Sequence, residues 1–253
     1  MASPCGHGRI QHRRWGFVVL RPAVLKAVIF DIDGTLIDSV DLHARSWVDS
    51  FARFGIQVTF EDVRRRIGEG ADRLIPAFVP PEMPDNRRKQ LEEFRSELFK
   101  RDYLDKVKPF PKVKELFACI KADGCKLVLA SSCAADEIDQ YKAIAGITDM
   151  TDHDVTADDA GSSKPSPDIF LQALDRLAPI GPSQTCVVGD TKYDGEAARR
   201  AGVPFLSLLC GGSSKDELER SGAMAIYRDP AELLTHWSSW RELSPKRESS
   251  AAY

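Results

Sequence analysis

Two aspartates separated by one residue follow a short apolar run near the start of the chain. The run is Ala27-Val28-Ile29-Phe30, and the next five residues are Asp31-Ile32-Asp33-Gly34-Thr35. Successive side chains of an extended segment point to opposite sides, so Asp31 and Asp33 face the same way. If the run is a strand of an open parallel sheet, both carboxylates lie in the crevice where such sheets bind ligands. We therefore predict that the pair supplies a nucleophile and a general acid or base.

Two simpler readings of this segment are disfavoured. Asp-Gly is a common turn signal, and Asp-x-Asp-Gly also begins an EF-hand calcium loop. Such a loop needs a further acid or amide at its fifth position and Glu at its twelfth, but Thr35 and Leu42 stand there. We therefore do not expect a calcium loop.

Further polar residues follow later strand-like runs or introduce a helix. They are Ser131 and Ser132 after residues 126–130, Lys164 before Pro165, and Asp190 and Asp194 after residues 185–188. Four aspartates in one crevice would repel one another unless a cation neutralised them. Magnesium fits best, because it takes one or two carboxylates and leaves positions for water and a substrate phosphate. With the charge of Lys164 and the hydroxyl of Ser131, the set predicts a site for phosphoryl chemistry.

The elements that must position these residues alternate along the chain. Strand-like runs recur at residues 28–30, 126–130, 185–188 and 203–208, with a weaker one at 223–226. Apolar residues at helical spacing lie between most of them, as at Val113, Leu116, Phe117 and Ile120. This alternation predicts an α/β fold, in which a Rossmann-like parallel sheet carries helices on both faces.

The alternation stops between about residues 39 and 105. Helical spacing begins at Val40, a second helix is indicated at residues 90–100, and a turn-rich segment with four prolines between 76 and 84 separates them. We predict an all-helical cap domain at 39–105, inserted into a core domain of residues 25–38 and 106–243. An insert at this point would cover the crevice as a lid. Residues 1–24 and 244–253 are predicted to be a flexible extension and tail.

Composition limits the partners of the chain. The 253 residues carry a formal net charge of −3, which gives no electrostatic case for binding nucleic acid or a membrane. The six cysteines form no CxxC pair, and no apolar run approaches the roughly 20 residues that span a bilayer. Arginines precede a short apolar stretch at residues 15–20, which is too short for a signal peptide. We predict a reduced, cytoplasmic protein, with organelle targeting as an alternative, and a monomer or weak dimer.

With these motifs in order, the sequence resembles the haloacid dehalogenase superfamily, in its phosphatase and phosphomutase branch with a small helical cap. The resemblance covers about residues 25–240. It rests on Asp31-Ile32-Asp33-Gly34-Thr35, Ser131, Lys164 and the segment 189–194, Gly-Asp-Thr-Lys-Tyr-Asp. As a set these four motifs are highly specific.

The resemblance implies a role for each matching residue. Asp31 would form an aspartyl phosphate, and Asp33 would protonate the leaving oxygen and then activate water. Magnesium would be held by Asp31, the Asp33 main-chain carbonyl and Asp190, with Asp194 as a further or water-mediated ligand. Ser131 and Lys164 would bind the phosphoryl group. The residues expected to contact substrate are Gly34, Thr35, Ser132, His43, Glu69 and Gly70.

Within the superfamily, Asp33 favours phosphoryl chemistry, because the dehalogenases and phosphonate-cleaving enzymes resembled here have no acid at that position. We predict a magnesium-dependent phosphatase for a small phosphorylated metabolite. A sugar phosphomutase is the alternative, since His43 and Trp47 match that branch. Ala71 stands where the mutase has an arginine, although Arg73 could substitute in another loop register. A dehalogenase or a non-catalytic binding module is less favoured.

Overall fold

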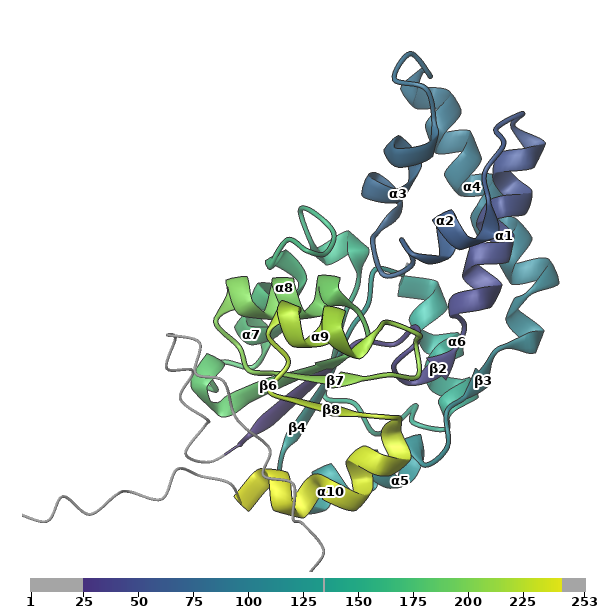
Figure 1. The fold of residues 1–253 in the computed structure, drawn as a ribbon. Coiled ribbons are helices and arrows are strands. Elements are labelled where there is room, and N and C mark those ends of the chain that lie inside the picture. The colour runs from purple at the N-terminus through teal and green to yellow at the C-terminus, as the bar shows by residue number, and fades with distance from the viewer. Residues whose placement is uncertain (1–24, 134, 243–253) are drawn as a thin grey trace, which may run out of the picture.

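A parallel sheet forms the centre of the computed structural model, which describes residues 25–133 and 135–242 (Figure 1). Its six strands lie in the order β5-β4-β1-β6-β7-β8, and every neighbouring pair is parallel. The strands are β1 Ala27–Phe30, β4 Lys126–Ala130, β5 His153–Val155, β6 Thr185–Gly189, β7 Phe205–Leu208 and β8 Ala225–Tyr227. The predicted α/β fold is confirmed. Strand β5 was missed, because its three residues include one buried apolar side chain, Val155.

Helices cover both faces of the sheet. Strand β1 shows why, since Val28 and Phe30 join one hydrophobic cluster while Ala27 and Ile29 join another on the opposite face. Figure 1 places α5 and α10 below the sheet and α7, α8 and α9 above it. The core helices are α5 Val113–Ala122, α6 Ala135–Ala145, α7 Asp168–Arg176, α8 Lys192–Ala201, α9 Lys215–Ser221 and α10 Pro230–Glu242, with short 3₁₀ turns η2 Ala157–Asp159 and η3 Pro182–Gln184.

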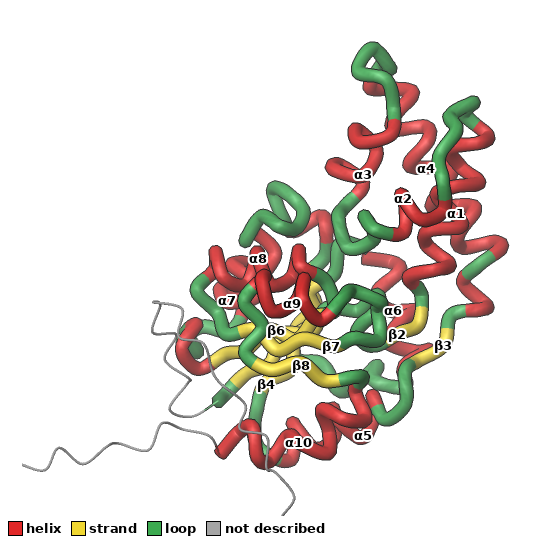
Figure 2. The backbone as a smooth tube through the Cα atoms, in the orientation of Figure 1, coloured by secondary structure: helices red, strands yellow, loops and turns green. Residues whose placement is uncertain are grey.

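A group of helices stands on this core (Figure 2). The part of the chain between β1 and α5 forms it. They are α1 Val40–Arg53, α2 Phe60–Arg64, α3 Ala71–Phe78 and α4 Asp85–Asp102, followed by the 3₁₀ turn η1 Leu104–Lys106. They enclose their own apolar cluster, which includes Trp47, Phe51 and Leu91. The chain enters and leaves through β2 Ile37–Asp38 and β3 Lys108–Pro109, which pair antiparallel. We call this helical group the cap; its exact limits as a domain stay a prediction.

The cap differs from the sequence prediction in two places. Pro76 lies inside α3, whereas we predicted a turn-rich connection there; burial of Leu74 and Ile75 holds this helix together. Helix α4 begins at Asp85 rather than Gln90. In the part of the chain that the structure describes, no helix is long and apolar enough to span a membrane. The predicted extension and tail, together with Ala134, lie outside the described residues.

Candidate active site

The carboxyl ends of three neighbouring strands bring the predicted site residues together. Phe30, the last residue of β1, pairs with Leu129 of β4 and with Val188 of β6, so the three strands end at one level. Asp31 and Asp33 therefore lie beside Ser131 and Asp190. This common edge is the crevice in which open parallel sheets bind ligands.

One buried lysine lies among three buried carboxylates. Lys164 Nζ is 2.5 Å from Asp31 Oδ1 and 2.8 Å from Asp194 Oδ1. Oxygens of Asp31, Asp190 and Asp194 lie within 4.8 Å of one another. Three carboxylates against one ammonium leave a negative surplus when all are ionised, and burial makes that surplus costly.

The pKa values of these groups record the same imbalance. Burial raises the pKa of Asp31 to about 7, despite the nearby charge of Lys164. Burial, followed by the charges of Asp31 and Asp194, raises the pKa of Asp190 well above its usual range. Burial would lower the pKa of Lys164, but the charges of Asp194 and Asp31 outweigh it and raise this pKa. The protein's own groups therefore favour holding protons on Asp31 and Asp190.

The surroundings of Asp190 fit a hard cation. Its Oδ1 accepts a hydrogen bond of 2.9 Å from the Thr35 hydroxyl, whereas its buried Oδ2 has no hydrogen-bond partner among the described residues. A Cβ atom built on Gly34 or Gly211 would lie 2.4 or 1.6 Å from Oδ2. An acidic oxygen kept clear by two glycines is suited to Mg²⁺, which binds oxygen ligands.

Asp194 is placed differently from the other carboxylates. Its Oδ2 accepts hydrogen bonds from the Thr191 hydroxyl and main-chain N–H at the start of α8, at 2.6 and 3.1 Å. Its Oδ1 is ion-paired with Lys164. One Asp194 oxygen is thus held at the start of α8, and the other faces Lys164 in the carboxylate cluster.

Gly34 and Thr35, which were predicted to contact substrate, use their main-chain N–H groups within the turn after β1. The Gly34 N–H donates to the Ile37 carbonyl within the turn, and the Thr35 N–H donates to Ile32. The Thr35 hydroxyl donates to Asp190 and, at 3.4 Å, to Asp31 Oδ2. Neither residue lines the cavity of about 160 Å³ above Asp31 and Asp33, which is described below. These donors support the turn and the carboxylates, and contact of either residue with substrate stays a prediction.

Asp33 contacts cap residues near the start of α1. Its Oδ1 accepts a hydrogen bond of 2.6 Å from the Ser39 hydroxyl and lies 2.7 Å from His43 Nε2. Burial raises the pKa of Asp33, but His43 and Ser39 against its carboxylate outweigh that effect and lower it. Asp33 is therefore ionised at neutral pH in this arrangement.

His43 is itself held in place. Its ring stacks on Phe99, with centroids 4.1 Å apart, and its Nδ1 contacts the Arg95 guanidinium. A guanidinium can only donate, so Nδ1 accepts and Nε2 donates to Asp33. Sequence reasoning missed Ser39 and Arg95. Helix α4 carries several basic residues, and only its packing against α1 distinguishes Arg95 from the others.

A cavity of about 160 Å³ opens above Asp31 and Asp33, between the cap and the core. It is lined by Asp31, Asp33, His43, Trp47, Ile67, Gly68, Glu69, Gly70, Ala71, Glu92, Arg95, Ser96, Ser131, Ser132, Cys133 and Glu137. We call it the substrate pocket. The predicted residues Ser131, Ser132, His43, Glu69 and Gly70 all line it. Lys164, Asp190 and Asp194 do not line this pocket.

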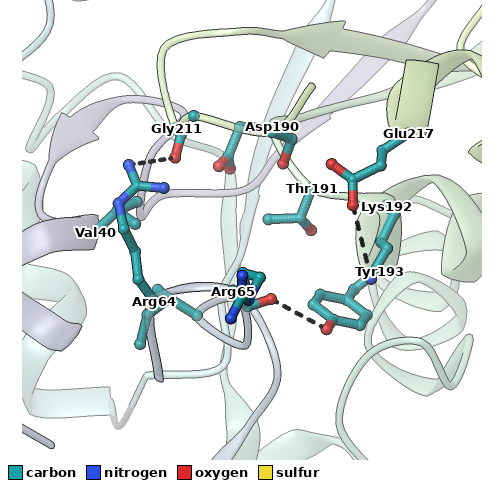
Figure 3. Close-up of a pocket in the computed structure, with 12 residues that line it drawn as sticks. Val40, Arg64, Arg65, Asp190, Thr191, Lys192, Tyr193, Gly211 and Glu217 are labelled. Carbon is teal, nitrogen blue, oxygen red and sulfur yellow. Dashed lines mark hydrogen bonds and ion pairs between the residues drawn. The ribbon is translucent and has the colours of Figure 1, made fainter. Parts of the chain in front are cut away.

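A second, smaller cavity of about 70 Å³ lies where the cap meets the core, beside Asp190 (Figure 3). Arg64 of α2 spans it, donating to the Gly211 carbonyl at 3.4 Å, while its Nε pairs with Asp41 at 2.6 Å. The Tyr193 hydroxyl donates to the Arg65 carbonyl at 3.4 Å. The contacts to Gly211 and from Tyr193 join cap and core beside Asp190.

The sheet, the carboxylate cluster around a buried lysine and the helical cap together define an α/β enzyme of the hydrolase class. The chain belongs to the haloacid dehalogenase-like hydrolase family, whose model matches residues 25–202. The resemblance inferred from the sequence motifs is confirmed.

Relatives differ in how much of their length the chain covers. It is 34% identical over 196 residues to the chloroplastic protein SUPPRESSOR OF QUENCHING 1 of Arabidopsis thaliana, using 73% of this chain but spanning only 18% of that protein. It is 30% identical to the phosphoglycolate phosphatase of Aquifex aeolicus, over 74% of this chain and 86% of the relative. It is also 30% identical to the phosphorylated carbohydrates phosphatase of Thermotoga maritima, over 83% of this chain and 97% of that relative.

A solved structure shares the whole fold. The crystal structure of a hydrolase from Pseudomonas syringae superposes with a TM-score of 0.75 at 29% identity, covering 85% of this chain and 98% of the other. Core and cap are thus found together in a related protein.

Proposed function

We propose that the protein is a magnesium-dependent phosphatase, which hydrolyses a small phosphorylated metabolite through a phosphoaspartate on Asp31. The observation that carries this proposal is the contact of 2.5 Å between Lys164 Nζ and Asp31 Oδ1, in a buried crevice shared with Asp190. A carboxylate held beside an ammonium is suited to attack an anionic phosphoryl group. The Aquifex aeolicus and Thermotoga maritima phosphatases named above support the same chemistry.

In the first step, an Asp31 oxygen attacks phosphorus and the bond from phosphorus to the leaving oxygen breaks. Asp33 donates a proton to that oxygen. Asp33 is ionised in the substrate-free arrangement, but an anionic phosphate arriving beside it raises its pKa and favours the protonated form. In the second step, Asp33 takes a proton from water, which attacks phosphorus and releases Asp31 and inorganic phosphate.

Lys164 and Ser131 bind the transferring group in this proposal. Lys164 Nζ also donates to the Ala130 carbonyl at 3.2 Å, and this contact fixes its position at the end of β4. Ser131 Oγ accepts from the Cys133 N–H at 3.3 Å, so its proton can be donated to a phosphoryl oxygen.

Asp31, Asp190 and the Asp33 main-chain carbonyl would hold Mg²⁺, with Asp194 acting through water. When bound, the cation neutralises the carboxylates and the phosphoryl oxygens. The unpartnered Asp190 Oδ2 is the observation that supports this set.

The phosphomutase alternative needs a cationic site for a second phosphate. Ala71 lines the substrate pocket and carries no charge, while Arg73 is exposed on α3 and does not line it. Arg95 does line the pocket, but its guanidinium contacts His43. A phosphatase therefore suits the pocket better. We also propose a cytoplasmic location, which cell fractionation would test.

The test is phosphate release from a panel of sugar phosphates, phosphoglycolate, nucleotides and an aryl phosphate, with and without Mg²⁺. We expect release only with Mg²⁺, and a loss of at least about 10³-fold in Asp31→Asn. Asp38→Asn, which alters an exposed carboxylate seven residues along, serves as the control. Equal release by Asp31→Asn and wild type would disprove the proposal.

A further inference from the structure

The substrate pocket carries more carboxylates than its catalytic pair requires. Beyond Asp31 and Asp33, it is lined by Glu69, Glu92 and Glu137, and among the described residues that line it the one guanidinium is that of Arg95. Glu69 is neutralised within the cap, because Arg66 lies 2.8 Å from its Oε2. Glu92 of α4 and Glu137 of α6 are the remaining glutamates that line the pocket.

The Arg95 guanidinium contacts several other cap residues. Its guanidinium lies over the Trp47 and Phe99 rings, at 5.2 and 4.9 Å from their centroids. Its Nε donates to the Ser46 hydroxyl at 3.2 Å, and its Nη2 contacts His43. These contacts hold it beside Asp33 and Glu92, so its charge is compensated by residues already in the pocket.

Glu137 is the buried member of this acidic set. It belongs to the first turn of α6, and only 5% of its surface is exposed. Its Oε1 accepts a long hydrogen bond, 3.4 Å, from the Ser96 hydroxyl of the cap. A carboxylate can accept about four hydrogen bonds, so Glu137 can accept more from a bound molecule.

We propose, building on the phosphatase function above, that the substrate is a phosphate monoester of a neutral polyhydroxy compound. Glu137 is the specificity residue: its carboxylate accepts hydrogen bonds from hydroxyl groups of the leaving alcohol. The same carboxylate disfavours substrates that carry a second anionic group, whether a carboxylate or another phosphate.

The selectivity follows from charge and burial. A hydroxyl that donates to a carboxylate makes a charge-assisted hydrogen bond, which is about twice as strong as a neutral one. An anionic group in the same position would meet like charge in a partly desolvated pocket, where repulsion is stronger than in water. A site built for hydroxyl groups therefore discriminates strongly against an acid of the same shape.

The test uses substrates that differ in one group. Glycerol 3-phosphate and 3-phosphoglycerate differ at one carbon, where a CH2OH group replaces a carboxylate, and glucitol 6-phosphate is paired with 6-phosphogluconate in the same way. We expect wild type to favour the member without the carboxylate in each pair, by at least about tenfold in kcat/KM. Glu137→Gln should reduce that ratio by about tenfold. Asp139→Asn, on an exposed position of the same helix, is the control and should keep the wild-type ratio.

A binding measurement separates this proposal from the phosphatase function. Calorimetry in the Asp31→Asn background, with and without Glu137→Gln, gives the affinity for each pair without turnover. Tighter binding of the neutral member, lost with Glu137→Gln, supports the proposal even if no substrate is hydrolysed. Equal or tighter binding of the acid with Glu137 in place, or a preference that Glu137→Gln leaves unchanged, would overturn it. Absence of phosphate release from every substrate counts against the phosphatase function alone.

Discussion

At the scale of single residues, the hydrogen bonds of Asp33 determine how it can act. Ser39 and His43 both contact Oδ1, at 2.6 and 2.7 Å. They leave Oδ2 as the oxygen for proton exchange with the substrate and with water. The same contacts hold the carboxylate in one orientation, which a group that acts in two successive steps requires.

Asp33→Asn should slow the two proposed steps to different extents. With an alkyl phosphate, loss of the acid should lower kcat by about 10² to 10⁴-fold. With an aryl phosphate, whose leaving group needs no proton, the first step should be spared and the second slowed. Stopped-flow absorbance should then show a burst of one phenol per site followed by slow turnover. Equal slowing for both substrates without a burst would contradict the assignment, and Asp38→Asn should behave as wild type.

Sequence reasoning located Asp31 and Asp190 because each directly follows a strand, where topology alone brings side chains together. Lys164 precedes α7 instead, and its match to the family motif located it. The pocket wall was less predictable. Glu137 and Arg95 are charged residues on helices rich in charge, and their spacing does not show which of them face the crevice. Only the packing of α4 and α6 across the pocket decides that.

At the scale of elements, the loop before α3 determines how closely the cap approaches the core. A Cβ atom built on Gly70 would lie 2.6 Å from Ser163 Cβ, on the segment that carries Lys164, and 2.7 Å from Asp72 Oδ1, the end of a side chain within the cap that can turn away. The φ angle of Gly70 is −74°, so alanine fits its backbone and any effect is steric. A small displacement of the cap would misplace the groups that position substrate.

Gly70→Ala should lower kcat/KM by about 10 to 100-fold without unfolding the protein, because positioning errors of about 1 Å have effects of this size. Adding Ser163→Gly should restore most of the activity, since it removes the opposing Cβ atom. Steady-state kinetics of both single variants and the double variant form the cycle. A double variant as impaired as Gly70→Ala would show that the contact does not control closure.

The elements were predictable to different degrees. Buried strands such as β4 and β6 carry continuous apolar runs, which predict them clearly. Strand β5 has a single buried apolar residue and exists because it pairs with β4. Pro76 is unfavourable inside a helix, but packing in the cap cluster outweighs that preference, which no local pattern reveals.

At the scale of the whole molecule, the acidic cluster links stability to pH. Burial raises the pKa of Asp31 from 3.8 to about 7, so the folded protein binds this proton more tightly than the unfolded chain. The stability that this proton adds is complete below the unfolded-state pKa of 3.8. It is lost as pH rises through the folded-state pKa of about 7. The pKa of Asp190 is raised in the same direction.

Magnesium should replace the protons, because its carboxylate ligands must be ionised. Without Mg²⁺, the melting temperature should fall between about pH 4 and pH 7 relative to an Asp190→Asn variant. The increase in melting temperature on adding Mg²⁺ should grow over the same range. Thermal unfolding at several pH values, with and without Mg²⁺, measures both. If Mg²⁺ raised the melting temperature by the same amount at the lowest and the highest pH of this range, the proposed metal site would be contradicted.

The most direct test of the central claim is to trap the phosphorylated enzyme. Rapid acid quench of wild type during turnover with Mg²⁺ and an aryl phosphate, followed by digestion and mass spectrometry, locates any phosphoryl group. We predict one phosphoryl group on the peptide that contains Asp31, absent in Asp31→Asn. A phosphoryl group on another residue, or rapid turnover with no adduct in wild type or in the slowly hydrolysing Asp33→Asn variant, would contradict a phosphoaspartate mechanism.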